Sequence, residues 1–476
     1  MAVVVAVVHL VLAAVRRAWP DEALMLAIGR YHLDFGAVDQ PPLTPLLARI
    51  ADTVAPGSQI VLAVPAVLAT AAAVVLTALT ARELGGDERS QTLAALGQGT
   101  GIAAAQFGHW LTPYTLEPAL WTAVFWLLLR GIRRDDGRAL VAAGAVLGVA
   151  AQTRLFALLL GAVLLGAVAV LGPRKLLRRP PLWAGAVLAL LIAAPTLLWQ
   201  ATHGWPQLAM TPVVAEENDE IYGSVLVSAA HGLAVTGPLL LGLAVCGLVA
   251  LVRDPRLRDV RFVGAACVLL YLAMVLSGGR HYYPLALYPV LAAIGAVGLQ
   301  HRREAGRPRR RAWPVVVVSG LLACVGALSS VYLAEPQFEE MLVSATADAY
   351  RALPAEQRDR TVLAADPYVY GAYLDAAPPG LGLPPAFGPN RAYGWFPEPP
   401  EDRDAMLLVG EPDRVRPWFG SARLVGGTYA DTPLGTYGGL VGEVPTIWLL
   451  EDRKAPWPEI RDATRDLQLP PVPLRS

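Results

Sequence analysis

Apolar residues dominate the first two thirds of the chain, where long runs alternate with short polar segments. Runs rich in alanine, valine and leucine continue to residue 333, and no later run approaches the roughly 17–25 residues that a helix needs to cross a bilayer. The pattern predicts a polytopic α-helical membrane domain over residues 1–333. A soluble domain, expected to be α/β, follows over residues 334–476.

Eleven apolar segments are candidate transmembrane helices, at about 1–15, 59–81, 90–108, 115–129, 139–153, 155–171, 182–199, 224–252, 262–277, 282–299 and 313–333. A signal peptide is the alternative for the first segment, although no convincing small-x-small cleavage site follows it. Only Arg154 interrupts the stretch 139–171, and strongly basic loops flank that stretch on both sides. An even number of crossings must join two loops on the same side, so we expect two spans with Arg154 at the hairpin tip.

Basic residues alternate from loop to loop. The alternate loops 82–89, 130–138, 172–181, 253–261 and 300–312 hold 20 Lys and Arg in total, whereas the loops between them hold 6. Cytoplasmic loops carry the excess of Lys and Arg in membrane proteins. The expected topology is therefore a multi-pass protein of the plasma membrane, with the C-terminal domain outside the cytoplasm.

The formal net charge of zero conceals two opposite charges. Residues 1–333 hold 26 Lys and Arg against 18 Asp and Glu, and residues 334–476 hold 13 against 21. Only 16% of the residues are charged, whereas soluble proteins have about 25%, and disordered chains are also far more polar. The three cysteines are too few for a disulfide scaffold. Membrane topology accounts for the basic residues, so they do not indicate nucleic-acid binding.

The first outer loop, 16–58, contains two acidic motifs. Apolar residues at 24, 27, 28 and 31 recur at helical spacing and predict an amphipathic helix on the outer surface, which Asp21 and Glu22 would begin. Carboxylates are favoured at a helix N-terminus, so a capping role is the structural alternative for this pair. Asp39 opens the segment Asp39-Gln40-Pro41-Pro42-Leu43, in which the prolines predict a stiff turn.

The other outer loops hold the remaining candidates. Glu117 lies at the outer mouth of a span, where an acid can also simply reach water. Arg280, His281 and Tyr282 lie at the entrance of another span, and their side chains suit phosphate. Snorkelling of Arg154 and anchoring of the tyrosine at the interface are the structural alternatives. The sequence has neither a Walker motif nor zinc-ligand spacing.

Several of these motifs together resemble one family. They are the Asp21-Glu22 pair, the Asp39-Gln40-Pro41-Pro42-Leu43 turn, Trp199-Gln200 with His203-Gly204-Trp205-Pro206, Gly278-Gly279-Arg280-His281-Tyr282-Tyr283, Leu383-Pro384, and Asn390-Arg391-Ala392-Tyr393-Gly394-Trp395. The chain resembles the protein O-mannosyltransferase-like C-type glycosyltransferases, a family that includes the bacterial lipid A aminoarabinose transferases. The C-terminal match is looser, because Gly394-Trp395-Phe396-Pro397 stands where relatives show a Trp-Gly-Pro-Pro-like turn.

The resemblance implies a reaction and roles for these residues. A polyprenyl-phosphate sugar would donate its sugar, with inversion, to an acceptor hydroxyl of a lipid, glycan or protein on the outer face of the membrane. Asp21 would be the general base, while Glu22, Asp39 and Glu117 compete for the role of the second acid. Arg154, Arg280, His281 and Tyr282 would hold the donor phosphate. Paired acids beside a phosphate are compatible with a divalent cation, although no ligand set stands out.

Two other functions remain open at the level of sequence. A transporter or flippase would also be polytopic, but it should have ionisable groups near the middle of the membrane, and here such groups gather at the outer interface. A non-catalytic scaffold for assembly of the cell envelope is the second alternative. The retained Asp21-Glu22 pair argues against it.

Overall fold

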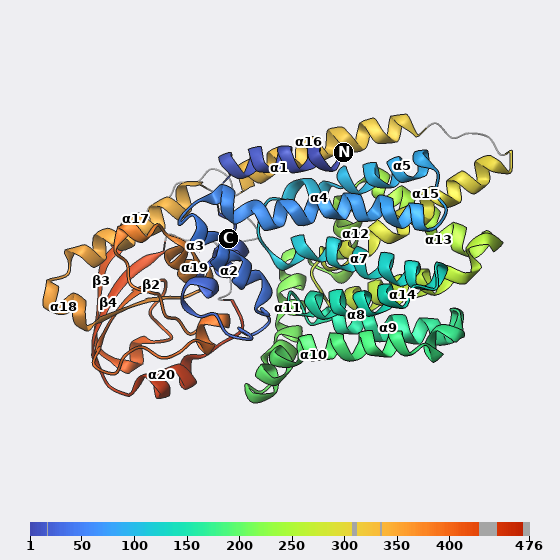
Figure 1. The fold of residues 1–476 in the computed structure, drawn as a ribbon. Coiled ribbons are helices and arrows are strands. Elements are labelled where there is room, and N and C mark those ends of the chain that lie inside the picture. The colour runs from blue at the N-terminus through green and yellow to red at the C-terminus, as the bar shows by residue number, and fades with distance from the viewer. Residues whose placement is uncertain (17, 307–311, 334–335, 428–444, 470–476) are drawn as a thin grey trace. The chain divides into compact units, whose positions relative to one another are not determined.

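The computed structural model describes residues 1–16, 18–306, 312–333, 336–427 and 445–469. These residues form two compact units (Figure 1). The first unit comprises Met1–Arg16 and Leu62–Tyr332, and the second comprises Arg17–Val61 and Leu333–Ser476. The first outer loop therefore groups with the C-terminal residues, whereas the sequence pattern assigned it to the membrane domain.

The first unit is helical throughout its regular structure. Its elements are α1 (Ala2–Val15), α4 (Gln59–Glu83), α5 (Glu88–Gly99), α6 (Ile102–Phe107), α7 (Pro113–Arg133), α8 (Gly137–Ala151), α9 (Phe156–Leu171), η1 (Arg174–Arg178), α10 (Pro180–Thr202), α11 (Pro206–Tyr222), α12 (Val225–Thr236), α13 (Pro238–Arg253), η2 (Pro255–Val260), α14 (Arg261–Leu276), η3 (Tyr283–Leu287), α15 (Tyr288–Glu304) and α16 (Trp313–Leu333). Among the described residues, five helices are long and apolar enough to cross a membrane, or up to seven if each of two bent pairs counts as one span. The chain is thus a multi-pass membrane protein, and the count of eleven crossings stays a prediction.

Two of the predicted spans are each divided into two helices. The segment 224–252 forms α12 and α13, which meet at 105° because Gly237 adopts a φ of 86° and Pro238 lacks an amide hydrogen. The segment 90–108 likewise divides into α5 and α6 before Gly101. An apolar run does not reveal such a bend, because both halves remain apolar.

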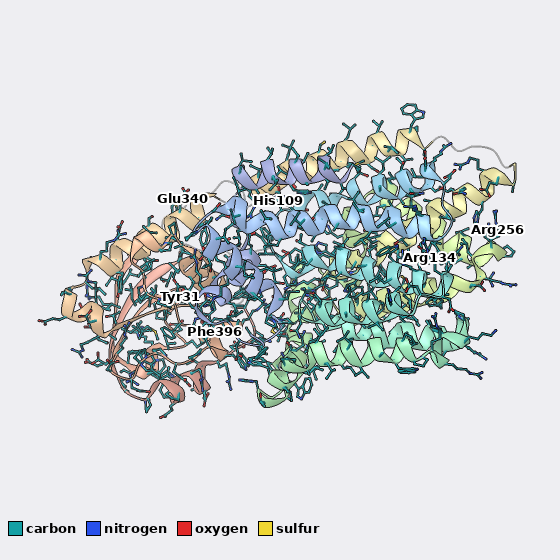
Figure 2. All side chains as sticks on the ribbon, in the orientation of Figure 1. Tyr31, His109, Arg134, Arg256, Glu340 and Phe396 are labelled. Carbon is teal, nitrogen blue, oxygen red and sulfur yellow. The ribbon has the colours of Figure 1, made fainter. Side chains whose placement is uncertain are left out.

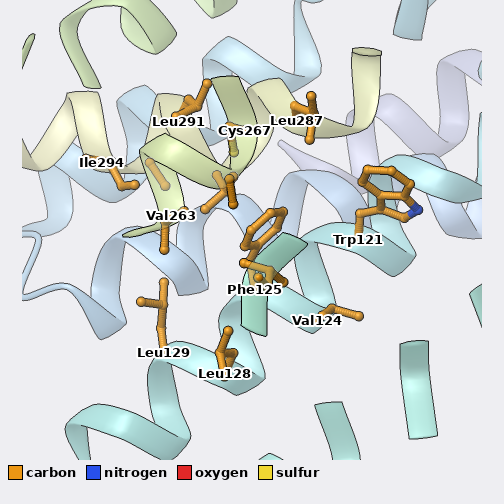
Figure 3. Packing of buried hydrophobic residues seen from close by; sticks show 14 of the residues in the cluster. Trp121, Val124, Phe125, Leu128, Leu129, Val263, Cys267, Leu287, Leu291 and Ile294 are labelled. Carbon is orange, nitrogen blue, oxygen red and sulfur yellow. The ribbon is translucent and has the colours of Figure 1, made fainter. Parts of the chain in front are cut away.

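Small residues allow the helices of the first unit to approach closely. A Cβ at Gly144 would lie 2.0 Å from the carbonyl oxygen of Gly185, so α8 and α10 touch through their backbones. A Cβ at Gly295 would lie 1.9 Å from the carbonyl oxygen of Leu243, and α13 and α15 meet in the same way. Such contacts are typical of helix pairs in membranes. Figure 3 shows part of the buried core of this unit, to which Trp121 and Phe125 of α7 and Cys267 of α14 belong.

Ion pairs join the basic loops at one end of the first unit. Glu83 at the end of α4 pairs with Arg134 at 2.8 Å, and Asp135 pairs with Arg179 at 3.0 Å. Arg134 lies toward the same end as Arg256, and His109 lies toward the other end (Figure 2).

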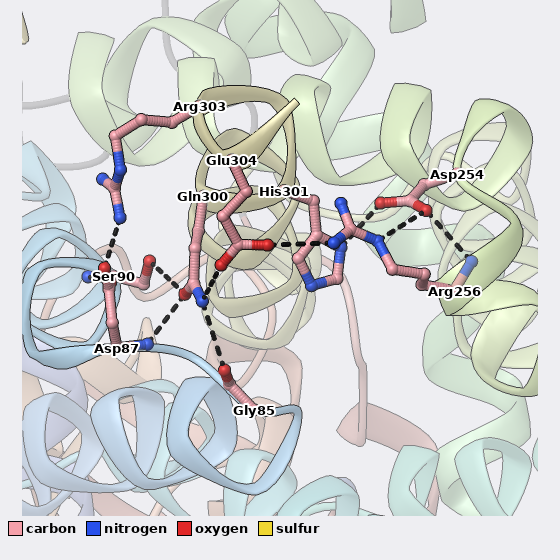
Figure 4. Close-up of polar contacts among 9 residues, drawn as sticks. All are labelled: Gly85, Asp87, Ser90, Asp254, Arg256, Gln300, His301, Arg303 and Glu304. Atoms are coloured by element: carbon pink, nitrogen blue, oxygen red, sulfur yellow. Dashed lines mark hydrogen bonds and ion pairs between the residues drawn. The ribbon is translucent and has the colours of Figure 1, made fainter. Parts of the chain in front are cut away.

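The same network continues into the last two basic loops (Figure 4). Asp87 pairs with Arg303, and Arg256 Nη1 donates to Glu304 Oε2 at 2.9 Å. The five loops with excess Lys and Arg are therefore neighbours in space, apart from residues 307–311, which lie outside the described residues. This arrangement agrees with a chain that returns to the same side at every second loop.

The second unit combines two loop helices with a four-stranded sheet. It contains α2 (Pro20–Tyr31), α3 (Leu43–Val54), α17 (Pro336–Ala352), α18 (Ala355–Arg360), β1 (Thr361–Ala365), α19 (Tyr368–Ala376), η4 (Pro379–Leu381), η5 (Arg391–Trp395), β2 (Ala405–Val409), η6 (Arg416–Trp418), β3 (Phe419–Gly427), β4 (Thr446–Arg453) and α20 (Trp457–Thr464). The strand order is β1-β2-β4-β3, parallel between β1 and β2 and antiparallel elsewhere. Figure 1 shows α17 and α20 on opposite sides of the sheet.

Arg30 of α2 forms hydrogen bonds with α3 and with the end of α19 in the second unit. Its Nε and Nη2 donate to both carboxylate oxygens of Asp52 on α3, at 2.8 and 2.7 Å. Its Nη1 donates to the carbonyl oxygens of Asp375 and Ala377 at the end of α19, both at 2.9 Å. The guanidinium thus uses its planar set of donors on two helices at once while only 7% of the side chain is exposed.

The carboxyl group of Asp375 is buried beside this junction. It accepts hydrogen bonds from the Ala386 amide and the Tyr393 hydroxyl, both at 2.7 Å. Burial raises the pKa of Asp375 to about 7, although these hydrogen bonds and the charge of Arg30 act to lower it. The folded state therefore retains a proton that the unfolded chain releases at lower pH.

We expect this part of the second unit to be less stable at pH 8 than at pH 5. A carboxyl group with a raised pKa in the folded state contributes stability at low pH and loses that contribution as the pH rises through about 7, by about 1.4 kcal/mol per pH unit below that value. Hydrogen exchange of the α19 amides, corrected for the intrinsic pH dependence, measures the effect. Asp375→Asn should remove most of the pH dependence, and an unchanged profile in that variant would contradict the assignment.

Candidate active site

The acidic pair of the first outer loop begins a helix. Asp21 and Glu22 occupy the first turn of α2, where the helix dipole favours carboxylates. The N-cap residue is Trp19, and its side chain makes no capping hydrogen bond. Asp21 is half-buried and Glu22 is fully buried.

The predicted amphipathic helix is present but does not lie on an open surface. Every residue from Glu22 to Gly29 is buried. A Cβ at Gly29 would lie 2.5 Å from the carbonyl oxygen of Pro45, so α3 packs directly on α2. The helical spacing of the apolar residues correctly predicted the helix. It could not predict that the helix is covered, because α19, one of the elements that pack on it, is far away in the sequence.

Asp39 lies in the turn that the prolines predicted. The backbone amides and carbonyls of Ala37 and Gln40 bond to each other at 3.0 and 3.1 Å, and they close a tight turn before the prolines. The Gln40 side chain donates to Asp39 Oδ1 at 3.0 Å. Asp39 is half-buried. Asp21, Glu22 and Asp39 all belong to the second unit.

Glu117 and Arg154 come together in the first unit. Glu117 Oε1 lies 3.9 Å from Arg154 Nε, and the two side chains are only 5% and 11% exposed. The Arg154 guanidinium carbon lies 4.2 Å from the ring centroid of Tyr283 and 5.9 Å from that of Tyr282. A buried guanidinium group that lies over aromatic faces is well suited to bind an anion.

Arg280 has a carboxylate partner that the sequence did not predict. Its Nη2 donates to Glu217 Oε2 of α11 at 2.5 Å, and the two side chains are 14% and 9% exposed. Next to it, His281 Nδ1 lies 2.8 Å from the Tyr222 hydroxyl at the end of the same helix. The helix α11 therefore supplies partners to Arg280 and His281, two of the four predicted phosphate-binding residues.

His281 is an uncharged member of this cluster. Burial, and then the charges of His231 and Arg280, lower the pKa of His281 to about 3. The ring is therefore neutral at pH 7. It remains a hydrogen-bond partner for a phosphate, but the positive charge there comes from Arg280.

Tyr282 joins the two clusters. Its ring centroid lies 4.6 Å from that of Tyr114 and 5.2 Å from that of His281, and the Arg154 guanidinium approaches it from another direction. Arg154, Arg280, His281 and Tyr282 thus form one contiguous region of the first unit. This region contains parts of several predicted outer loops and lies apart from the network of basic loops.

Sequence reasoning missed Glu217, Asn218 and Tyr222. One signal was available, because residues 216–220 of α11 hold four acidic residues in a loop that has no Lys or Arg. The pairing with Arg280 spans 63 residues of sequence and could not be anticipated from spacing. No group of three or more His, Cys, Asp or Glu side chains within the described ranges could hold a metal ion.

The comparisons with known proteins agree with the resemblance seen in the sequence. Residues 39–199 match the family described as dolichyl-phosphate-mannose-protein mannosyltransferase. The structure is similar to that of ArnT from Cupriavidus metallidurans bound to undecaprenyl phosphate, with a TM-score of 0.61 and 15% identity over 94% of this chain and 96% of ArnT. For ArnT in the apo state the TM-score is 0.62 and the identity 15%, over 93% and 96% of the two chains.

A more distant similarity extends to another membrane transferase. The oligosaccharyltransferase of Archaeoglobus fulgidus matches with a TM-score of 0.50 and 13% identity, over 78% of this chain and 61% of that protein. No curated protein matches this sequence. The fold is therefore that of the membrane glycosyltransferases, and the resemblance to the protein O-mannosyltransferase-like family is confirmed.

Proposed function

We propose that this chain, which has the fold of ArnT, is an inverting glycosyltransferase of the plasma membrane. It takes a sugar from a polyprenyl-phosphate sugar and transfers it to a hydroxyl group of a lipid, glycan or protein acceptor on the outer face. The observation that carries this proposal is the pair of buried arginines, Arg154 and Arg280, in the first unit, between which the rings of Tyr282 and His281 lie next to each other. Buried guanidinium groups among tyrosines provide the charge and the hydrogen-bond donors that a departing lipid phosphate requires.

The reaction needs one base and no strong acid. Asp21 accepts the proton of the acceptor hydroxyl, whose oxygen forms a bond to the anomeric carbon as the bond from that carbon to the phosphate oxygen breaks. The electron pair leaves with the polyprenyl phosphate, and attack from the opposite face inverts the configuration. Arg154 and Arg280 stabilise the charge that develops on the phosphate, while His281 and Tyr282 offer neutral hydrogen bonds.

The other acids have supporting roles in this proposal. Glu117 holds Arg154 in place through the 3.9 Å contact, and Glu217 does the same for Arg280. Glu22 and Asp39 flank the base in sequence and are candidates for orienting the acceptor. Carboxylates of the first outer loop would be the ligands of a divalent cation, which would supply positive charge beside the phosphate.

A panel of labelled donors tests this function directly. Membranes from cells that produce the protein and from cells that lack it are incubated with polyprenyl phosphates that carry different sugars. We expect one donor to be consumed only in the presence of the protein, with the label recovered on an acceptor. Loss of every donor at equal rates in both membranes would contradict the proposal, and movement of an intact donor across the bilayer would favour a flippase.

A further inference from the structure

A small cavity lies directly against Arg280 in the first unit. Asn218, Ser228, Gly279, Arg280, His281 and Tyr288 contribute the polar part of its lining, from α11, α12, the loop after α14 and the start of α15, and apolar residues such as Val225 and Met274 contribute the rest. Its volume of about 10 Å³ gives room for about one water or one ligand oxygen. Neither the family resemblance nor the sequence motifs assign Asn218 or Ser228 a role.

Asn218, which contributes to the lining of this cavity, has a donor left over. The residue is only 1% exposed, and its Oδ1 accepts a hydrogen bond from Ser228 Oγ at 3.1 Å. Its Nδ2 is buried and has no hydrogen-bond partner among the described residues. A buried amide nitrogen without a partner is costly, so in the working protein it should donate to a water or to a ligand.

Ser228 determines which way the amide faces. Because a hydroxyl that donates to Oδ1 fixes the oxygen on the Ser228 side, the nitrogen is the atom left over. The Tyr222 hydroxyl holds the His281 ring beside the same cavity, at 2.8 Å from Nδ1. The cavity is thus lined by the Asn218 amide, the Arg280 guanidinium group and the neutral His281 ring.

We infer that Asn218 is a further ligand of the donor phosphate, oriented by Ser228 and acting beside Arg280. A set of donors with one positive charge selects an anionic oxygen over a cation or an apolar group. The inference rests on the proposed function, which supplies the phosphate, and it assigns one phosphate oxygen to this cavity. In the absence of donor, a water would occupy the same position and satisfy Nδ2.

Two substitutions separate this role from a structural one. Asn218→Ala removes the donor and should weaken binding of undecaprenyl phosphate by about 10-fold. Asn218→Asp keeps the shape but presents a negative charge to the phosphate, and should weaken binding by about 100-fold or more. Ser228→Ala removes the hydroxyl that orients the Asn218 amide and should weaken binding of undecaprenyl phosphate by a smaller factor. Undecaprenol, which lacks the phosphate, should bind to all the variants with equal affinity.

The experiment measures lipid binding and sugar transfer on the full-length protein, with folding checked by thermal unfolding. Thr211→Asp adds the same charge to an exposed position of α11 and should leave affinity unchanged. If the Asn218 variants bind undecaprenyl phosphate as tightly as the wild type, even when they are less stable, the inference is overturned. The amide would then bind only a water and contribute to folding alone. The proposed function is tested by a different result, the sugar transfer of the wild-type protein. It stands if the wild type transfers sugar, whatever the Asn218 variants do, and it fails if the wild type transfers none.

Discussion

Asp21→Asn is expected to lower the rate of sugar transfer by about 10²- to 10⁴-fold while the protein still folds and binds polyprenyl phosphate. Asparagine has nearly the same shape as aspartate, but it cannot accept the proton of the acceptor hydroxyl. Asparagine is also a favoured residue at a helix N-terminus, so the first turn of α2 should tolerate the substitution. Single-turnover assays with saturating donor measure the chemical step directly.

The matched control is the same substitution at an exposed position. Asp259→Asn removes an equivalent charge from a side chain that is 76% exposed, and should leave the transfer rate unchanged. Glu22→Gln and Asp39→Asn test whether a neighbouring carboxylate is the base instead. Of these two variants and Asp21→Asn, only Asp21→Asn should abolish the chemical step. Normal turnover in Asp21→Asn would remove this residue from the mechanism.

Arg280→Ala should raise the KM for the donor by about 10- to 100-fold and leave the KM for the acceptor nearly unchanged. The loss has two sources. The substitution deletes a charge-assisted hydrogen bond to the phosphate, and it also exposes the phosphate to the buried carboxylate of Glu217, which Arg280 otherwise pairs at 2.5 Å. Steady-state kinetics with each substrate varied in turn separate the two constants.

A double-mutant cycle tests the second source. Glu217→Gln combined with Arg280→Ala should recover part of the donor affinity, because the repulsion disappears although the cation is still absent. Arg258→Ala, at a side chain that is 74% exposed, serves as the control for a lost positive charge. A larger effect on the acceptor than on the donor would count against the assignment of Arg280.

The sequence predicts the helical part of this protein well because its signals are local. Apolar runs and the alternation of basic loops identified the segments that form helices, and the lone Arg154 between two apolar segments correctly indicated a turn. The bend at Gly237-Pro238 was missed, since an apolar pattern continues through it. The grouping of α2 and α3 with the C-terminal sheet was also missed, because it depends on contacts such as those from Arg30 to the end of α19.

The sequence also predicted one part of the candidate site and missed another. Arg154, Arg280, His281 and Tyr282 were found because charged and aromatic residues are rare at the ends of apolar spans, and the structure brings them together. Their environment was not accessible to sequence reasoning, since the charge state of His281 follows from burial and the partner of Arg280 is Glu217 on a distant helix. The roles of Asp21, Glu22 and Asp39 stay proposals that kinetics must test.

One measurement tests the central claim most directly. Purified protein in lipid vesicles is supplied with a labelled polyprenyl-phosphate sugar and an acceptor, and both products are quantified over time. We expect one polyprenyl phosphate to be released for each glycoside formed, with inverted anomeric configuration, and neither product to form with Asp21→Asn. Movement of the intact donor across the bilayer without cleavage, or equal turnover by the variant, would contradict the account.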